Sequence, residues 1–154
     1  MLVDFHSHCL PGVDDGPKNV QTAVEIVHRT RRQGVDIIVA TPHFFAHRES
    51  VGAFLERRRQ AFDKLKERLD GEQISRILLG AEVALERDFS LVEDVESLCF
   101  GTPGYILLEL PPVDFREWMI QEIQNVAYKH SVTPVIAHLE RCVGVYTRDD
   151  IERI

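Results

Sequence analysis

The chain has 154 residues, 44% of them hydrophobic and 28% charged, with a net charge of −7 at pH 7; this balance predicts one globular domain over residues 1–154. The negative charge argues against nucleic acid or an anionic membrane as a partner, because both are bound through basic surfaces. No apolar run approaches the roughly 20 residues of a membrane-spanning helix, and the N-terminus lacks the features of a signal peptide, so we expect a cytoplasmic protein without membrane insertion.

Strand and helix signals alternate from the N-terminus onward. Residues 2–5 (LVDF) predict a strand, and Asn19 can cap a helix whose apolar residues recur at helical spacing to about residue 34. Residues 35–41 (VDIIVAT) predict a fully buried strand. Ser50 can cap a second helix that carries one apolar stripe up to Gly71.

Arginine-rich segments occur in both predicted helices, at residues 28–33 and 56–60. With a negative overall charge, we interpret them as solvated helix faces. Residues 74–83 (ISRILLGAEV) then form a third apolar run.

The second half continues the same alternation. Residues 105–110 (YILLEL) and 133–138 (TPVIAH) predict two more strands, and Asp114 with Glu117 is a capping-box pattern for the helix between them. Strands that are apolar throughout indicate parallel pairing under covering helices, so the fold class is α/β. A barrel and an open doubly wound sheet both fit.

The last residues begin a further element. Thr147 and Asp150 have the pattern of a helix start, but only about one helical turn fits before Ile154. We therefore expect a chain whose C-terminal part is incomplete.

Ionisable side chains lie at or just after the C-terminal end of every predicted strand. They are His6, His8, His43, Glu82, Glu109, His138, Glu140 and Arg141. In parallel α/β folds this edge of the sheet binds ligands. Imidazoles and carboxylates together suit Mn²⁺, Fe²⁺ or Zn²⁺ better than Ca²⁺. The pattern predicts a metal site assembled from several strands.

Each of these residues also has a structural interpretation. A His-x-His pair can lie on a surface, and His43 can belong to a turn. Glu82 and Glu109 interrupt apolar runs, so each needs a metal or a basic partner nearby. His47, in a polar loop, is either a solvated residue or a substrate contact.

Five segments together resemble one known superfamily. They are DFHSHCLPGVDDG, IIVATPH, GAEV, YILLEL and PVIAHLER. They resemble the PHP superfamily, named for polymerase and histidinol phosphatase domains, and more closely its branch of bacterial manganese-dependent protein tyrosine phosphatases of capsule and exopolysaccharide synthesis. The resemblance implies a distorted (β/α)7 barrel, here with the first five strand-helix units of a single PHP-like domain. It also implies two or three Mn²⁺ ions, with Fe²⁺ or Zn²⁺ as alternatives.

The resemblance also implies roles for single residues. The metal ligands would be His6, His8, His43, Glu82, Glu109 and His138. Arg141 would bind the substrate phosphate, and the Asp14–Asp15 turn would match the acidic loop beside the site. Apart from the resemblance, His47 is a candidate substrate contact from its polar loop, and in the metal mechanism Asp14 or a histidine would protonate the leaving group. The substrate would be the phosphotyrosine segment of a bacterial tyrosine kinase.

Two features depart from the family pattern. Leu139 replaces a proline that is common in the family, and no late Asp-x-His follows His138. We therefore expect that the chain is truncated or that neighbouring copies complete the barrel as a homo-oligomer.

The predicted chemistry is metal-assisted hydrolysis of a phosphate monoester, namely protein phosphotyrosine. It requires no thiol nucleophile, because neither Cys9 nor Cys142 begins a Cys-x5-Arg loop. One alternative is a small-molecule phosphoesterase acting on a histidinol-phosphate-like or nucleotide substrate. The other is a truncated, non-catalytic module for metal binding or assembly.

Overall fold

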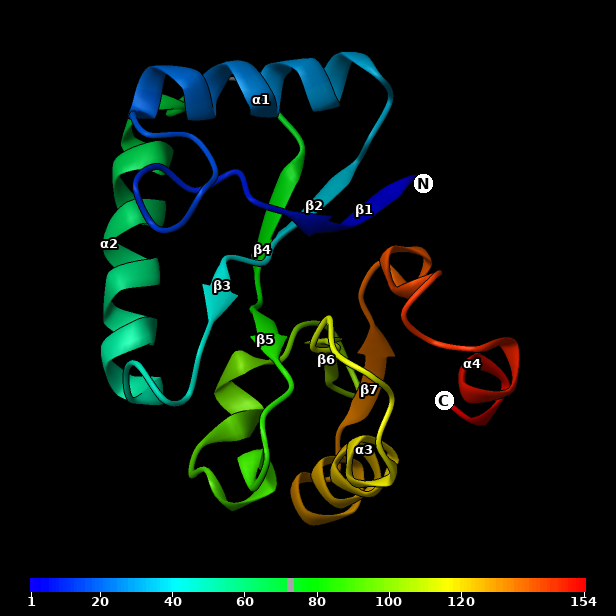
Figure 1. The fold of residues 1–154 in the computed structure, drawn as a ribbon. Coiled ribbons are helices and arrows are strands. Elements are labelled where there is room, and N and C mark those ends of the chain that lie inside the picture. The colour runs from blue at the N-terminus through cyan, green and yellow to red at the C-terminus, as the bar shows by residue number, and fades with distance from the viewer. Residues whose placement is uncertain (72–73) are drawn as a thin grey trace.

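Two parallel sheets flanked by helices make up the fold of the computed structural model, which describes residues 1–71 and 74–154 (Figure 1). The first sheet has the order β1-β2-β4, with β1 at Val3–Ser7, β2 at Ile37–Ala40 and β4 at Arg76–Leu79. The second has the order β3-β5-β6-β7, with β3 at His43–Phe44, β5 at Glu82–Ala84, β6 at Tyr105–Glu109 and β7 at Thr133–Ile136. All strand pairings are parallel, so the predicted α/β class with parallel sheets is confirmed.

One of the predicted apolar runs is divided between the sheets. Residues 35–41 contain a single strand, β2, which ends at Ala40, and β3 begins beyond that run at His43. Residues 74–83 form β4 and the start of β5, with a break at Gly80. A Cβ at Gly80 would lie 3.0 Å from the Phe100 ring and 3.3 Å from Val39. This close approach leaves little room for a side chain at the bend.

The helices begin close to where the sequence places them. Asn19 caps α1 (Val20–Arg32) and Ser50 caps α2 (Val51–Arg68), each through a side-chain oxygen that accepts a backbone amide. Both caps are confirmed. Thr147 and Asp150 form a capping box at α4 (Arg148–Arg153), as predicted.

The predicted capping box of Asp114 and Glu117 is wrong. The N-cap of α3 (Glu117–His130) is Arg116, which makes no side-chain cap hydrogen bond. Three short 3₁₀ helices complete the fold: η1 at Phe89–Leu91, η2 at Val95–Leu98 and η3 at Leu139–Cys142.

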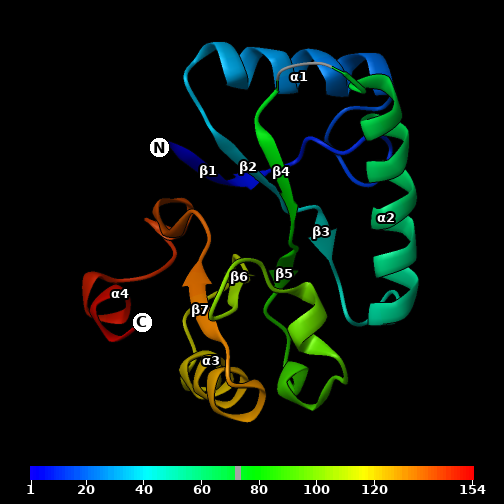
Figure 2. The same cartoon turned by 180° about the vertical axis from the view of Figure 1, so that it is seen from behind.

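The core consists of two clusters that helix α2 joins. Leu65 of α2 packs with Val27 and Ile38 in the cluster under the first sheet. Phe54 of the same helix packs with Phe44 and other apolar residues of the second sheet. Because one helix buries residues in both clusters, it holds the two sheets together at the side opposite the chain ends (Figures 1 and 2).

Two arginines of α2 correct the interpretation of residues 56–60 as a solvated face. Arg58 is 8% exposed and donates to the backbone carbonyls of Gly80 (2.6 Å) and Ser97 (3.3 Å). Arg57 donates to the carbonyl of Val13 (2.6 Å). The bends and loops beside α2 leave carbonyls without strand partners, and these two guanidinium groups satisfy them.

No helix in the described part of the chain has both the length and the apolar character needed to cross a membrane.

Candidate metal centre

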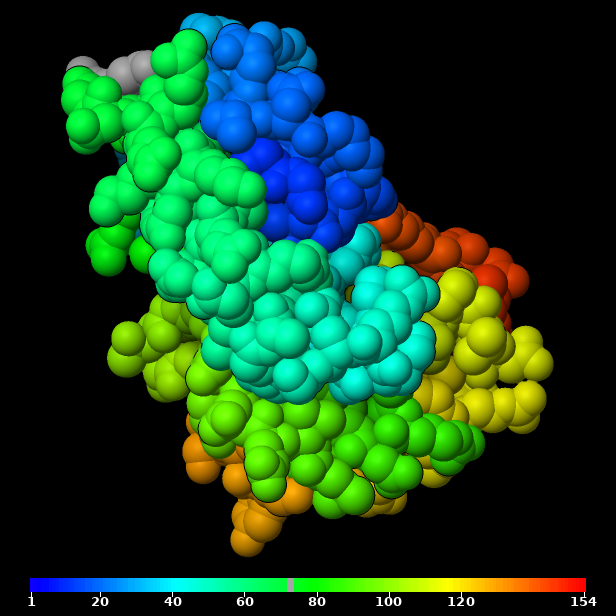
Figure 3. All heavy atoms as spheres, turned by 90° about the vertical axis from the view of Figure 1, so that its left-hand side faces the viewer, coloured from blue at the N-terminus to red at the C-terminus, as the bar shows by residue number. Residues whose placement is uncertain are grey.

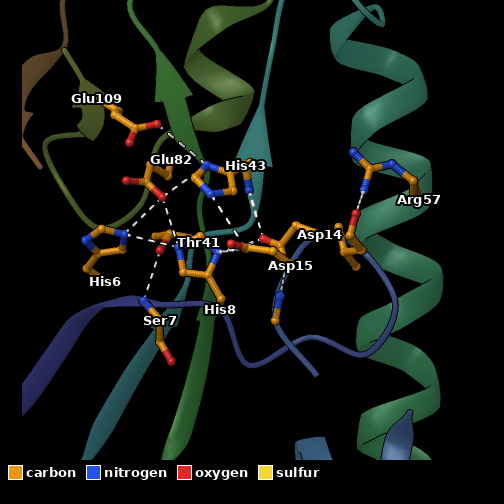
Figure 4. A network of polar contacts seen from close by, with 12 residues as sticks. His6, Ser7, His8, Asp14, Asp15, Thr41, His43, Arg57, Glu82 and Glu109 are labelled. Carbon is orange, nitrogen blue, oxygen red and sulfur yellow. Dashed lines mark hydrogen bonds and ion pairs between the residues drawn. The ribbon is translucent and has the colours of Figure 1, made fainter. Parts of the chain in front are cut away.

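Four histidines from separate parts of the chain surround the carboxylate of Glu82 (Figure 4 labels three of them). Glu82 begins β5 and its side chain is 1% exposed. Its Oε2 lies 3.1 Å from His6 Nε2, 2.9 Å from His8 Nε2 and 3.2 Å from His43 Nδ1. Its Oε1 lies 2.6 Å from His138 Nε2. One buried carboxylate is therefore the centre of the cluster.

Strand geometry places the first two rings. His6 lies on β1 and His8 follows it, so both side chains leave the chain on the same side. Thr41 secures this strand end, because its hydroxyl accepts from Ser7 N (3.0 Å) and its own amide donates to Ser7 O (2.8 Å). The ring nitrogens His6 Nε2 and His8 Nε2 lie 3.3 Å apart.

The loop after β1 fixes the orientation of His8. Asp14 Oδ2 accepts from His8 Nδ1 (2.6 Å) and from the His43 amide (3.1 Å), and Asp14 Oδ1 accepts from the Gly16 amide (2.9 Å). A Cβ at Gly16 would lie only 2.5 Å from the His8 carbonyl oxygen. Glycine is required there for the loop to close against β1.

The contacts around Glu82 fit a shared cation. In the neutral tautomer whose Nδ1 donates to Asp14, His8 directs an unprotonated Nε2 at Glu82 Oε2. Among the described residues, Glu82 Oε2 and His43 Nδ1 are buried with no hydrogen-bond partner. Neighbouring ligand atoms bound at 2.0–2.2 Å to one ion lie about 2.8–3.1 Å apart in octahedral geometry and about 3.3–3.6 Å apart in tetrahedral geometry. The observed separations of 2.9–3.3 Å are close to these ranges.

Electrostatics in the cluster hold both carboxylates in the charged form. Burial alone would raise the pKa of Glu82, but the imidazoles of His6, His8 and His138 lower it well below its usual range. Burial also opposes ionisation of Asp14, but its hydrogen bonds with His8 and two backbone amides lower the pKa. The hydrogen bond with Asp14 and the nearby Glu82 carboxylate raise the pKa of His8 to about 10. Protons and divalent cations therefore compete for this ring.

Two more carboxylates extend the donor set outward. Asp15 Oδ1 lies 3.7 Å from His43 Nε2 and 3.9 Å from His8 Nδ1. Glu109 lies 3.8 Å from His43 Nδ1 and 3.7 Å from His138 Nε2. Three overlapping groups of ligand atoms result: His6, His8 and Glu82; His8, Asp15 and His43; His43, Glu82 and Glu109. Imidazole nitrogen with carboxylate oxygen is a donor set for Mn²⁺, Fe²⁺ or Zn²⁺.

All six predicted ligand positions thus lie together at the ends of the strands. Most of them line a hollow of about 380 Å³ that also contains Glu140 and Arg141. His138 reaches Glu82 from a backbone with φ of +28°, in the left-handed region that residues other than glycine rarely adopt. Such strain is typical of functional sites.

The structure gives two predicted residues different surroundings from those expected. His47 is exposed and does not line this hollow; its Nδ1 lies 2.6 Å from Glu86 Oε1. Asp14 accepts three hydrogen bonds, which favour the ionised form and therefore disfavour the predicted proton donation.

Sequence reasoning did not include Asp15 among the candidate ligands. The signal was the adjacent Asp14–Asp15 pair before Gly16, because a carboxylate next to the residue that orients His8 also reaches the site.

Comparison with known proteins shows a clear likeness. Residues 2–154 match the family described as capsular polysaccharide synthesis, CpsB/CapC. Over 97% of this chain, the sequence is 28% identical to CapC of Staphylococcus aureus. Over 91% of this chain, it is 31% identical to the tyrosine-protein phosphatase YwqE of Bacillus subtilis. These alignments cover 58% and 55% of the two relatives.

A solved structure gives the same result. It is described as YwqE of Bacillus subtilis and CpsB of Streptococcus pneumoniae, unique metal-dependent tyrosine phosphatases. The match has a TM-score of 0.69 at 30% identity and covers 91% of this chain and 56% of the solved chain. The chain therefore spans a little over half the length of the relatives that it matches.

Proposed function

The chain belongs to the CpsB/CapC family of capsular polysaccharide synthesis, and from this premise we propose that it contributes the metal-binding half of a phosphatase that hydrolyses protein phosphotyrosine. The observation that carries the proposal is the buried Glu82 carboxylate, whose Oε2 has three imidazole nitrogens within 3.2 Å and no hydrogen-bond partner in the described part of the chain. A carboxylate charge at this depth is costly unless a cation compensates it.

The proposed metal ligands are the six predicted residues together with Asp15. A pair of divalent cations, when bound, supplies Lewis acidity toward phosphoryl oxygens and lowers the pKa of a water nucleophile. We favour Mn²⁺, since the donor set is mixed imidazole and carboxylate.

The remaining residues position the substrate and the ligands. Arg141 lines the same hollow as the ligands, and its planar guanidinium can hold two phosphoryl oxygens at once. Asp14 keeps the His8 ring in one orientation through the 2.6 Å hydrogen bond to Nδ1. Asp15 is 81% exposed and lines the same hollow, so its carboxylate is open to a bound ion.

We further propose that the two parallel sheets are consecutive parts of a PHP-type barrel. The strand orders leave β1 at the edge of one sheet and β7 at the edge of the other, and parallel edges of this kind are usually covered or paired. The proposed physiological substrate is the phosphotyrosine segment of a bacterial tyrosine kinase of capsule synthesis, and the proposed location is the cytoplasm.

Metal content and substrate turnover test the proposal together. The purified chain is expected to retain at least two Mn²⁺ ions and to release phosphate from a phosphotyrosine peptide faster than from histidinol phosphate or a nucleoside monophosphate. A preference for the small substrates would favour the phosphoesterase alternative. Fewer than two ions, with no turnover after Mn²⁺ addition, would favour the non-catalytic module.

Cysteine variants separate this mechanism from thiol chemistry. Cys9 and Cys142 are both buried, and burial raises the pKa of each thiol, to about 11 for Cys9, so neither is a ready thiolate nucleophile. Cys9→Ala and Cys142→Ala should keep activity within a few-fold of the parent chain. Loss of turnover in either folded variant would contradict the metal mechanism.

A further inference from the structure

A second hollow, of about 580 Å³, opens beside the metal centre. It shares Asp15 and His43 with the hollow around Glu82, so the two are neighbours with a common wall. Its other walls come from the loop after β1, the segment after β3 and helix α2. In Figure 3, which faces α2, the blue loop and the cyan segment meet beside this helix. The volume is within the roughly 300–1,000 Å³ typical of small-molecule sites.

The wall nearest the metal centre is aromatic. The half-buried ring of Phe45 lies 5.7 Å from the His43 ring, measured between centroids, at an interplanar angle of 33°. Val13 adds an aliphatic surface to the same hollow. A group leaving the metal centre past His43 therefore meets apolar surface directly.

Arg48 adds a flat, charged surface to this wall. Its Cζ lies 4.2 Å from the centroid of the Phe45 ring, and its Nε donates to His47 Nε2 (3.2 Å). The other nitrogen of His47 is held by Glu86 at 2.6 Å, which fixes the ring that orients Arg48. His47 is thus a positioning residue for Arg48.

The two arginines of this hollow differ in their charge balance. Arg57 forms an ion pair with Glu49 and donates to the Val13 carbonyl. Arg48 has no carboxylate partner among the described residues; its contacts are the Phe45 ring and His47 Nε2. No carboxylate in the described part of the chain therefore balances the Arg48 guanidinium, and its free face can stack on a ligand.

We propose that the hollow formed by Phe45, Arg48 and Val13 is the subsite for the aromatic ring of the phosphoester, and that it makes the enzyme selective for aryl over alkyl phosphates. The inference rests on the proposed phosphatase function, because the phosphoryl group must lie in the neighbouring hollow. A phenyl ring is joined to phosphorus through one ester oxygen, so it occupies the space directly beyond the common wall of His43 and Asp15. Phe45 contacts the ring edge or face, and Arg48 provides a cationic plane for stacking.

Binding of two unreactive phosphonates tests the subsite without turnover. Calorimetry with the Mn²⁺-loaded chain should show benzylphosphonate binding roughly tenfold tighter than propylphosphonate. Phe45→Ala should reduce that difference to about twofold or less without changing propylphosphonate affinity. Phe45→Leu preserves apolar volume and should give an intermediate value, which protects the result against a folding defect in the alanine variant.

A matched aromatic pair elsewhere serves as the control. Arg153 Cζ lies 5.4 Å from the centroid of the Phe115 ring, and neither residue lines either hollow. Phe115→Ala should therefore leave the aryl preference unchanged. Arg48→Ala should weaken benzylphosphonate alone. Equal weakening of both phosphonates would place Arg48 on the phosphoryl group and overturn the proposal, as would an unchanged preference in Phe45→Ala or no preference in the parent chain.

Turnover measured in parallel distinguishes the two proposals. The parent chain should hydrolyse phenyl phosphate with a lower KM than propyl phosphate. Phe45→Ala should raise the KM for phenyl phosphate and leave the KM for propyl phosphate unchanged. If the chain hydrolyses neither ester but keeps the phosphonate preference, the proposed function fails and the aryl subsite stands.

Discussion

The two hollows share His43 and Asp15 but differ in how their walls are built. Around Glu82, ionisable atoms lie 2.6–3.9 Å apart and come from residues 6 to 138, at the ends of several strands. Around Phe45, the aromatic and cationic wall comes from one short segment, residues 45–48. The difference indicates that the ionic hollow around Glu82 is built by long-range convergence of strands, whereas the aromatic wall around Phe45 is built by one local segment. Substitutions in one hollow should leave the property of the other intact.

The largest effect is expected at the centre of the ionic hollow. Glu82→Gln retains the side-chain volume but removes the charge that four imidazoles contact. Loss of a buried charged partner costs about 3–5 kcal/mol, so Mn²⁺ affinity should fall by roughly 100- to 4,000-fold. Metal titration with inductively coupled plasma detection measures this.

A second buried glutamate provides the matched control. Glu122 lies on α3 and is 7% exposed, and its carboxylate accepts from the Ser90 amide. It lines neither hollow. Glu122→Gln should leave Mn²⁺ affinity unchanged. Equal losses in the two variants would mean that metal binding responds to general destabilisation and not to Glu82.

Removal of the group that orients His8 should have a smaller effect. Asp14→Asn replaces the carboxylate that accepts from His8 Nδ1 at 2.6 Å. Residues that orient metal-binding histidines typically contribute 10–100-fold in affinity or activity, and a loss of about 10–100-fold is expected here. Asp36→Asn, at an exposed carboxylate paired with Arg31, is the control. Full Mn²⁺ affinity in Asp14→Asn would show that Asp14 does not position His8 for metal binding.

Closure of the loop beneath both hollows can be tested at Gly16. A Cβ there would lie 2.5 Å from the His8 carbonyl oxygen, and overpacking of this kind costs about 1–3 kcal/mol. Gly16→Ala should lower Tm by about 2–4 °C for each kcal/mol and weaken Mn²⁺ binding as well. Gly52→Ala, on α2 with open space around the site of the added Cβ, should be neutral or stabilising. A Gly16→Ala chain as stable as the Gly52→Ala chain would contradict the close approach.

The smallest effect is expected for the residue that positions Arg48. His47→Ala removes the acceptor of the Arg48 Nε hydrogen bond but leaves the Phe45 ring in place. One hydrogen bond to a charged group contributes about 1.5–3 kcal/mol when buried, and exposure reduces this, so we expect a loss of roughly two- to fourfold in the aryl preference with unchanged Mn²⁺ affinity. A fall in Mn²⁺ affinity would show that His47 affects both hollows and would contradict the expectation that substitutions in one leave the other unchanged.

Much of the ionic hollow could be predicted because parallel strands end at one edge of a sheet. His6, His8, His43 and Glu82 each occur at a strand start or end, and the buried position of Glu82 within an apolar run already required a partner. Glu109 followed the same logic but is 27% exposed and makes only longer contacts, at 3.7 and 3.8 Å. The pattern of apolar and polar residues predicts where a side chain lies along a strand but not how deeply it is buried.

The boundaries that failed depend on contacts distant in sequence. Residues 74–83 read as a single strand, because an apolar run carries no mark of the bend that divides it. The bend at Gly80 depends on Phe100 and on the Arg58 guanidinium that binds the Gly80 carbonyl. Arg57 and Arg58 were misinterpreted for the same reason, because they bind backbone carbonyls that no sequence pattern identifies, whereas Arg59 is exposed as expected.

The sequence by itself determined the α/β class, the helix caps at Asn19, Ser50 and Thr147, and the residue types that gather around Glu82, since these follow from local hydrogen bonding and from the polarity of strand ends. Only the tertiary structure decided the division into two sheets, the role of Asp14 as a support for His8, and the hollow in which Arg48 covers Phe45. These features arise from side chains and carbonyls that meet across the fold, where distance and direction, rather than residue type, determine which groups interact.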